Sequence, residues 1–224
     1  MKPLVSCLCV TKNRPDKLAR AIQCLRFQTY SNIELVVVYE SNDLATANII
    51  SIHKDIRLNA IVVDAERNLT LGELRNISIE SAAGDFFCQW DDDDWYHPER
   101  VELQLREILE TGKMACLLSR WHMFDSITGQ FYLSHYRMWE GSILCNLNKF
   151  RNKMIVYPSI SKSEDTSVIE ILHSMDEVCL LDLPYLYIYT FHGSNTWDVE
   201  HFKMNWNKGI PISFKDVSEF YGIS

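Results

Sequence analysis

Four consecutive aspartates, Asp91 to Asp94, end an apolar run, Phe86 to Trp90, and are followed by a second tryptophan, Trp95. Four adjacent carboxylates repel one another by roughly 1 kcal/mol per close pair even in water. A chain tolerates such a row where a cation or several hydrogen-bond donors meet it, and oxygen-only ligands suit Mg²⁺ or Mn²⁺ rather than zinc. The alternative is a solvated acidic turn. The apolar run and the flanking tryptophans favour a binding site.

A second acidic pair, Glu164 and Asp165, lies between Ser163 and Thr166. A carboxylate aimed at a hydroxyl group can take its proton as a general base. The same four residues also suit the start of a helix, where acidic side chains complement the positive end of the helix dipole. On the residues alone, the helix start is the favoured interpretation.

Composition limits the classes of protein to which the chain can belong. Its 224 residues, 47% of them hydrophobic, suffice for one sizeable domain or one domain with an appendage. The net charge is −8 and no basic face is visible, so we expect no nucleic-acid partner. No apolar run approaches the ~18 residues that span a bilayer. The start of the chain lacks the apolar core of a signal peptide, and we therefore expect a cytoplasmic protein.

Seven cysteines are scattered through the chain, mostly within apolar runs, and no CxxC sequence occurs. This distribution predicts buried, reduced thiols in a cytosolic protein. It argues against a zinc site.

The elements that would position the acidic row alternate in the first half of the chain. Strands are predicted at residues 4–10, 33–39, 60–63 and 86–90, and helices from Pro15, over residues 44–53, from the capping box at Thr70 and Glu73 to Gly84, and from Pro98 to Gly112. This alternation predicts an α/β fold with a doubly wound, mostly parallel sheet and helices on both faces.

The strand order 3-2-1-4 would place a ligand crevice where the order reverses, beyond the carboxyl ends of the strands. That crevice lies between the turn at Thr11 to Asn13 and the acidic row. No GxGxxG or P-loop sequence is present, which disfavours Rossmann dinucleotide binding and Walker-type nucleotide binding.

The second half of the chain has a mixed character. Strands are predicted at residues 114–118, 121–125, 130–133, 155–157, 178–181 and 185–191, with a hairpin turn at Thr128-Gly129, a short apolar run after Ser142, and a helix from Ser163 to about Met175. The tail from Asn195 is aromatic and polar, and no element is predicted there. No internal repeat or linker divides the chain, so one domain is expected over residues 1–224.

Five segments follow one another in a recognisable order. They are Val10-Thr11-Lys12-Asn13-Arg14 with Leu18 and Ala21, then Gln28-Thr29-Tyr30 with residues 33–38, then Gly72 with Arg75-Asn76, then Trp90 to Trp95 with Pro98-Glu99-Arg100, and finally Glu164-Asp165. In this order they resemble the family 2 glycosyltransferases, which have the GT-A fold. A DxD sequence alone carries little information, but five matching pieces spread over most of the chain are specific.

The resemblance implies an inverting transfer of a sugar from a nucleoside-diphosphate sugar, with a UDP-sugar expected, to a hydroxyl of a glycan or lipid-linked acceptor, as in polysaccharide biosynthesis. Residues 1–112 would bind the donor and residues 113–224 the acceptor. Because charge builds up on the departing diphosphate, Mn²⁺ or Mg²⁺ is expected as cofactor.

The resemblance also implies residue roles. Asp165 is the expected general base, and Asp93 the metal ligand with His192 as a late metal contact. Contacts to the donor are expected from Thr11, Asn13, Arg14, Glu40, Arg75, Asp91 and Asp92, and contacts to the acceptor or the sugar from Glu164, Trp95 and Trp139.

Each role has a structural alternative. Asn13 can cap the following helix, and Asp92 and Asp94 can cap turns or orient Asp93. Arg75 can form a surface salt bridge, while His192 and the tryptophans can be structural.

The chain departs from the family where its second strand ends in Tyr39-Glu40, because the family usually has two aspartates there. Glu40 can still accept a hydrogen bond from the nucleotide base, but its side chain is longer than that of aspartate. The identity of the nucleotide base therefore stays open. No membrane-binding tail follows the catalytic half, although peripheral contact with the inner face of a membrane is compatible with the sequence. The alternatives are an inactive sugar- or nucleotide-binding module and a nucleotidyltransferase, whose glycine-rich loop is missing after the first strand.

Overall fold

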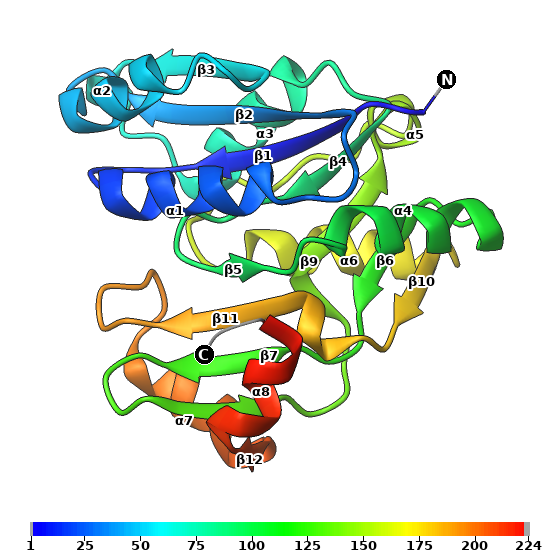
Figure 1. Cartoon of the computed structure of the whole chain (residues 1–224). Coiled ribbons are helices and arrows are strands. Elements are labelled where there is room, and N and C mark those ends of the chain that lie inside the picture. Colours follow the sequence, from blue (N-terminus) through cyan, green and yellow to red (C-terminus); the bar gives the residue numbers. More distant parts are fainter. Residues whose placement is uncertain (1, 222–224) are drawn as a thin grey trace.

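The computed structural model describes residues 2–221 and, within them, the side chains of residues 2–218. Seven strands form the first sheet in the order β10-β6-β9-β4-β1-β2-β3 (Figure 1). Their bounds are β1 Val5–Val10, β2 Ile33–Glu40, β3 Leu58–Val63, β4 Phe86–Gln89, β6 Ala115–Leu118, β9 Trp139–Asn146 and β10 Val178–Leu181. β3, β2, β1 and β4 are parallel neighbours, which confirms the predicted 3-2-1-4 order.

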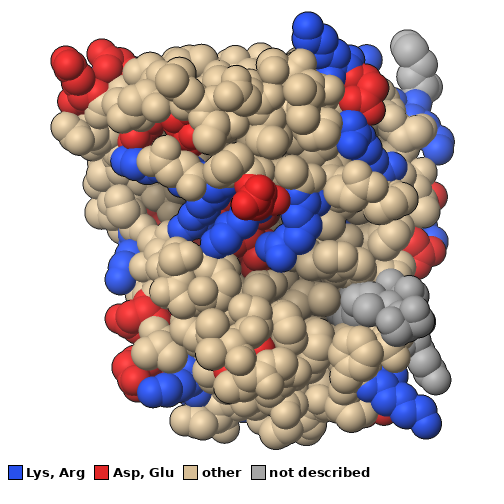
Figure 2. All heavy atoms as spheres, turned by 60° about the vertical axis from the view of Figure 1, so that its left-hand side comes forward, with Lys and Arg blue, Asp and Glu red and all other residues tan. Residues whose placement is uncertain are grey.

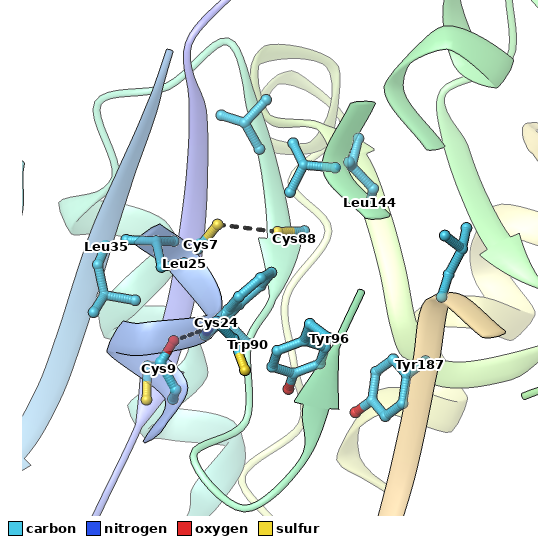
Figure 3. Close-up of a cluster of buried hydrophobic side chains, with 14 of the residues drawn as sticks. Cys7, Cys9, Cys24, Leu25, Leu35, Cys88, Trp90, Tyr96, Leu144 and Tyr187 are labelled. Atoms are coloured by element: carbon cyan, nitrogen blue, oxygen red, sulfur yellow. Dashed lines mark hydrogen bonds between the residues drawn. The ribbon is translucent and has the colours of Figure 1, made fainter. Parts of the chain in front are cut away.

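Helices cover both faces of this sheet because its strands bury alternate side chains on opposite sides. On one face, α1 (Pro15–Arg26) and α4 (Arg100–Thr111) pack against the side chains of Val5, Cys7 and Cys9. Figure 3 shows Cys7 and Cys9 beside Cys24 and Leu25 of α1. On the other face, α3 (Leu71–Ser81), α5 (Leu147–Asn152) and α6 (Glu164–Ser174) pack against Leu8 and its neighbours. Strands buried on both faces are typical of parallel sheets, and the predicted α/β class is confirmed.

Local signals in the sequence set several of the helix ends. α1 begins at Pro15, and α3 begins with the predicted capping box, in which Thr70 and Glu73 bond reciprocally. α4 ends at Gly112, whose φ of 70° suits a residue without a Cβ. The remaining helices of the first half are α2 (Leu44–Ile52) and a 3₁₀ turn, η1 (Ala65–Arg67).

A second sheet of five strands lies below the first in Figure 1, in the order β12-β8-β7-β11-β5. Its bounds are β5 Trp95–Tyr96, β7 His122–Asp125, β8 Gln130–Leu133, β11 Tyr187–Phe191 and β12 Ile210–Ile212. β7 and β8 form the predicted hairpin. β5 follows the acidic row directly and pairs with β11, so the acidic row connects the two sheets.

Some predictions for the second half of the chain are wrong. Residues 155–157 do not form a strand: the side-chain amide of Asn76 bonds both the N–H (2.9 Å) and the C=O (2.8 Å) of Tyr157, and so replaces a neighbouring strand. The strand predicted at residues 185–191 begins only at Tyr187, because residues 184–186 form a 3₁₀ turn, η2 (Pro184–Leu186). The tail forms α7 (Val199–Lys208), β12 and α8 (Phe214–Tyr221), which were not predicted.

Two expectations about burial and membranes have clear outcomes. All seven cysteines are buried and free, as predicted. Within residues 2–221, every helix is too short or too polar to cross a bilayer.

Candidate active site

A cavity of about 260 Å³ opens beyond the carboxyl ends of β1 and β4, between the two sheets. Figure 2 shows this side of the molecule, with Lys and Arg side chains on both sides of an acidic patch in the hollow. The residues that line the cavity come from both halves of the chain and include Val10, Arg14, Arg75, Asp91 to Asp94, Trp139, Glu164, Asp165, Tyr187, Trp197 and His201. The structure therefore brings the acidic row and the second acidic pair together.

Arg75 links the two acidic groups. Its Nε donates to Glu164 Oε1 (2.8 Å), and its terminal nitrogens lie 3.3 Å from Asp91 Oδ1. Only 7% of Arg75 is exposed, so the alternative of a surface salt bridge is wrong. Gln89 Nε2 donates to the other Asp91 oxygen (2.9 Å), which holds that carboxylate from both sides.

Asp92 is tied to the loop after β1. It accepts a hydrogen bond from Thr11 Oγ1 (2.6 Å) and lies 3.3 Å from the guanidinium of Arg14. Burial raises the pKa of Asp92 to about 6, and the charge of Asp93 adds to that effect. Thr11 therefore positions Asp92 and is not among the residues that line the cavity.

Asp93 is surrounded by cationic and histidine side chains. His192 Nε2 lies 3.0 Å and Arg14 NH1 2.9 Å from Asp93 Oδ2. Burial raises the pKa of Asp93, but these contacts outweigh burial and hold it below the usual range. Arg20 donates to the Asp93 backbone oxygen (2.6 Å), and Lys17 Nζ contacts the His192 ring.

Asp93 and His192 fit a metal ion that binds together with a phosphate ligand. Within the described residues, no three His, Cys, Asp or Glu side chains are arranged to hold a metal ion by themselves. Mg²⁺, however, is usually bound through one or two carboxylates, and waters and substrate phosphates fill the remaining positions. Asp93 is one such carboxylate, and His192 Nε2 lies 3.0 Å from its Oδ2.

Asp94 is a structural member of the row. Its exposure is 1%, and it accepts hydrogen bonds from the Tyr187 hydroxyl (2.5 Å) and the Thr190 N–H (2.9 Å) of β11. Burial raises the pKa of Asp94 well above its usual value, with further contributions from Asp93 and Asp91. Asp94 thus fixes the end of the acidic row to the second sheet.

Asp165 lies in the first turn of α6 and faces the cavity. Burial raises its pKa to about 7, and the neighbouring charge of Glu164 adds to the shift while Arg75 opposes it. No hydrogen bond joins its carboxylate to another residue that the structure describes, whereas Glu164 is held by Arg75. A free carboxylate with a pKa near neutrality is suited to general-base catalysis.

Five of the predicted site residues lie outside the lining of the cavity: Thr11 and His192, described above, and Asn13, Glu40 and Trp95. The Glu40 carboxylate ends β2 and pairs with Lys12 Nζ (2.7 Å). Asn13 does not cap α1, because Arg14 occupies the N-cap position and makes no side-chain capping bond. The N–H of Asn13 donates to Asp43, and the φ of Asn13 is 53°. Trp95 packs against the core from β5.

Trp139 lines the cavity as predicted, although only 3% of it is exposed. Its ring stacks on Trp121 at 4.4 Å. Trp197 and His201 stack on each other at 4.4 Å and also line the cavity. The sequence interpretation considered stacking on a sugar for Trp197 but missed His201. It also missed Lys17 and Arg20, although the three- and six-residue spacing from Arg14 predicts one helix face.

Comparison with solved structures defines the fold. S. aureus TarS in complex with UDP superimposes with a TM-score of 0.70 at 16% identity, over 85% of this chain and 61% of TarS. The mannosyltransferase PcManGT from Pyrobaculum calidifontis, in complex with GDP-Man and Mn²⁺, gives 0.65 at 13% identity, over 85% of this chain and 57% of PcManGT. The chain therefore has the GT-A fold of glycosyltransferases.

Sequence comparison defines the family. The model of glycosyl transferase family 2 matches residues 6–163, and the chain belongs to that family. The putative glycosyltransferase EpsH of Bacillus subtilis is 34% identical over 104 residues, which are 46% of this chain and 30% of EpsH. The uncharacterized glycosyltransferase MJ1057 of Methanocaldococcus jannaschii is 29% identical over 167 residues, 71% of this chain and 55% of MJ1057. The chain thus spans 30% to 55% of these two relatives, and the family match ends directly before Glu164.

Proposed function

We propose that this chain is an inverting glycosyltransferase that moves a sugar from a nucleoside-diphosphate donor to an acceptor hydroxyl. The observation that carries the proposal is the single cavity faced by both the acidic row and Asp165, with Arg75 between them. A metal site and a general base that face one cavity suit a reaction in which a leaving group departs as a hydroxyl attacks.

The donor would lie along the acidic row. Arg14, Arg75, Asp91 and Asp92 line its end of the cavity, and Thr11 would act through its hydrogen bond to Asp92. Asn13 and Glu40 belong to the edge where the nucleotide base would bind. There Glu40 would give up its ion pair with Lys12 and contact the nucleotide base instead. We propose a UDP-sugar; TarS was solved with UDP and UDP-GlcNAc, and PcManGT with GDP-Man.

Charge on the departing diphosphate would be met by the side chains around Asp93. Asp93 and His192 would hold Mn²⁺ or Mg²⁺, which supplies Lewis-acid stabilisation of the diphosphate when bound. Arg14 at the N-cap of α1 and Lys17 and Arg20 in its first turns each contact Asp93 or His192. These three side chains add positive charge there. Support for an ion comes from the Mn²⁺ in the PcManGT complex.

Asp165 would take the proton of the acceptor hydroxyl. The oxygen of that hydroxyl forms the new bond to the sugar carbon while the bond from that carbon to the diphosphate breaks on the opposite face, which inverts the configuration. Glu164 would accept the hydrogen bond from Arg75 Nε and so hold the start of α6 in place. Trp139 and Trp197, with residues 113–224 generally, would receive a glycan or lipid-linked acceptor.

The test begins with donor identification. Thermal shift with UDP- and GDP-sugars, with and without Mn²⁺, should raise the melting temperature for the true donor, because ligands stabilise the folded state by mass action. Asp165→Asn should then lower donor hydrolysis or transfer at least a hundredfold while nucleotide binding stays unchanged. Glu170→Gln on the exposed side of α6 is the matched control.

Two other outcomes would argue against this function. A binding module without catalysis would bind the nucleotide but show no turnover that depends on Asp165. A protein that binds no nucleotide with Mn²⁺ present would contradict the enzyme proposal itself.

A further inference from the structure

Arg100 is buried beneath the acidic row with most of its hydrogen-bonding capacity unused. Its exposure is 0%, and its Nε donates to Gln104 Oε1 (3.1 Å). The two terminal nitrogens of the guanidinium have no hydrogen-bond partner, and no carboxylate lies within 4.0 Å of it, among the residues that the structure describes. Arginine stays protonated in proteins, so this is a buried and unpaired positive charge.

Three aromatic rings take the place of an anionic partner. The Arg100 Cζ lies 4.6 Å from the ring centroid of Tyr96, 4.9 Å from that of Tyr187 and 5.4 Å from that of Trp90. Figure 3 shows these three rings in a row between the two sheets, and the Tyr96 centroid is 4.0 Å from Trp90 and 5.0 Å from Tyr187. A desolvated cation over an aromatic face is attracted by the ring quadrupole, which offsets part of the burial penalty.

Two of these rings hold the acidic row by their hydroxyl groups. Tyr96 donates to the backbone oxygen of Asp91 (2.9 Å), and Tyr187 donates to Asp94 Oδ2 (2.5 Å). The two bonds lie on either side of Asp92 and Asp93, which contact Thr11, Arg14 and His192. A cation against a phenol ring draws electron density from it and makes its hydroxyl a stronger donor.

We propose that Arg100 is a positioning residue, whose buried guanidinium orients and polarises Tyr96 and Tyr187 so that their hydroxyls fix Asp91 and Asp94 around Asp93. Its catalytic consequence rests on the proposed glycosyl transfer, whereas the clamp itself does not. A pure packing role is the competing explanation, because Arg100 also fills space between α4 and the rings.

Two substitutions separate the roles. Arg100→Met keeps much of the volume and removes the charge. It should leave the melting temperature unchanged or raised, because relief of a buried charge outweighs the loss of the bond to Gln104 and of the three cation–ring contacts. Arg100→Lys keeps the charge but loses the planar group and buries a strongly hydrated ammonium, so it should lower the melting temperature.

Catalysis should follow the opposite order. With the donor found above, kcat should fall at least tenfold in Arg100→Met and less in Arg100→Lys, so the more stable variant is the less active one. The matched control is Arg106→Met on the exposed side of α4, where one ion pair with Glu110 is lost. Activities that rise and fall with the melting temperatures across these variants would overturn the positioning role.

A substrate-free measurement keeps the clamp testable if transfer activity is not found. In protein labelled with ¹³Cζ-tyrosine, the Tyr96 and Tyr187 signals are assigned with Tyr96→Phe and Tyr187→Phe. Arg100→Met should move both signals, because their hydroxyl bonds weaken, and Arg106→Met should move neither. Unmoved signals in a folded Arg100→Met protein would disprove the clamp, regardless of whether the chain transfers sugars.

Discussion

At the scale of single residues, Asp165 makes the proposed reaction dependent on pH. Its pKa is raised to about 7 by burial and by Glu164, and a base must be deprotonated to accept a proton. The transfer rate should therefore rise through pH 7 and level off above it. A rate–pH profile at saturating donor measures this limb, and a profile without a rise between pH 6 and 8 would contradict the assignment of Asp165.

The same raised pKa has a consequence for stability. An unfolded aspartate ionises near pH 4, whereas folded Asp165 stays protonated to about pH 7, so the wild-type fold loses stability between those values as pH rises. Asp165→Asn lacks this loss. Its melting temperature should exceed that of the wild type by a margin that grows from pH 4 to pH 7 and is constant above, as followed by circular dichroism in the absence of substrate. A margin independent of pH would show that Asp165 has an ordinary pKa.

Asp93 offers a test of the metal proposal. Asp93→Asn removes the charge that His192 and Arg14 now contact, so Mn²⁺ with the nucleoside diphosphate should bind at least tenfold more weakly. Isothermal titration with and without Mn²⁺ measures the effect, and Asp55→Asn, which removes an exposed ion pair with Arg26, is the control. Equal Mn²⁺ dependence in all three proteins would remove Asp93 from the metal site.

At the scale of elements, Gly72 lets α3 approach the segment that leads to α6. A Cβ at Gly72 would lie 1.8 Å from the Pro158 backbone oxygen, and the Gly72 N–H donates to Ile160 O (3.0 Å). Neither backbone group can move without displacing Asn76 and Tyr157 nearby, so Gly72→Ala should destabilise the fold by about 1–3 kcal/mol. Urea unfolding measures this, with Glu80→Ala on the exposed side of α3 as control; an equal midpoint for both variants would mean that the segment yields freely.

The elements also explain what the sequence could predict. The strands and helices of the first half followed from periodicity, because apolar runs, caps and turns are local signals, whereas the crevice depended on assuming the strand order 3-2-1-4. Gly72 and Asn76 were recognised only by resemblance, since their partners Pro158 and Tyr157 lie more than 80 residues away in the chain. For the same reason, a buried segment held by one asparagine side chain was mistaken for a strand.

The candidate site shows the same division. Asp93 and Asp165 were predictable because acidic residues at a strand end and at a helix start are conspicuous. His201 was not, because it reaches the cavity from a tail whose helix and strand were unpredicted. Arg100 was part of a matching segment, but its burial among three rings depends on β5 and β11 pairing across the chain.

At the scale of the whole molecule, the two halves share one structure. β9 and β6 from the second half continue the first sheet next to β4. β9 contributes to both hydrophobic cores, because Leu144 lies in the core under α1 and α4 and Cys145 in the core under α3 and α6. We therefore propose that the donor half, residues 1–112, is a functional region that does not fold as a separate domain.

This arrangement predicts how the chain unfolds. A fragment of residues 1–112 would lose β9, α5 and α6, and with them Leu144, Phe150 and Leu172, all 0% exposed in the intact fold. Each such side chain contributes about 1.5–3 kcal/mol of burial, and the sum over the lost core exceeds the ~5–15 kcal/mol net stability of a domain. The fragment should show no cooperative thermal transition by calorimetry, while the 224-residue chain unfolds in one. A folded fragment, or two separate transitions in the intact chain, would mean that the first four parallel strands and their helices are stable without β9.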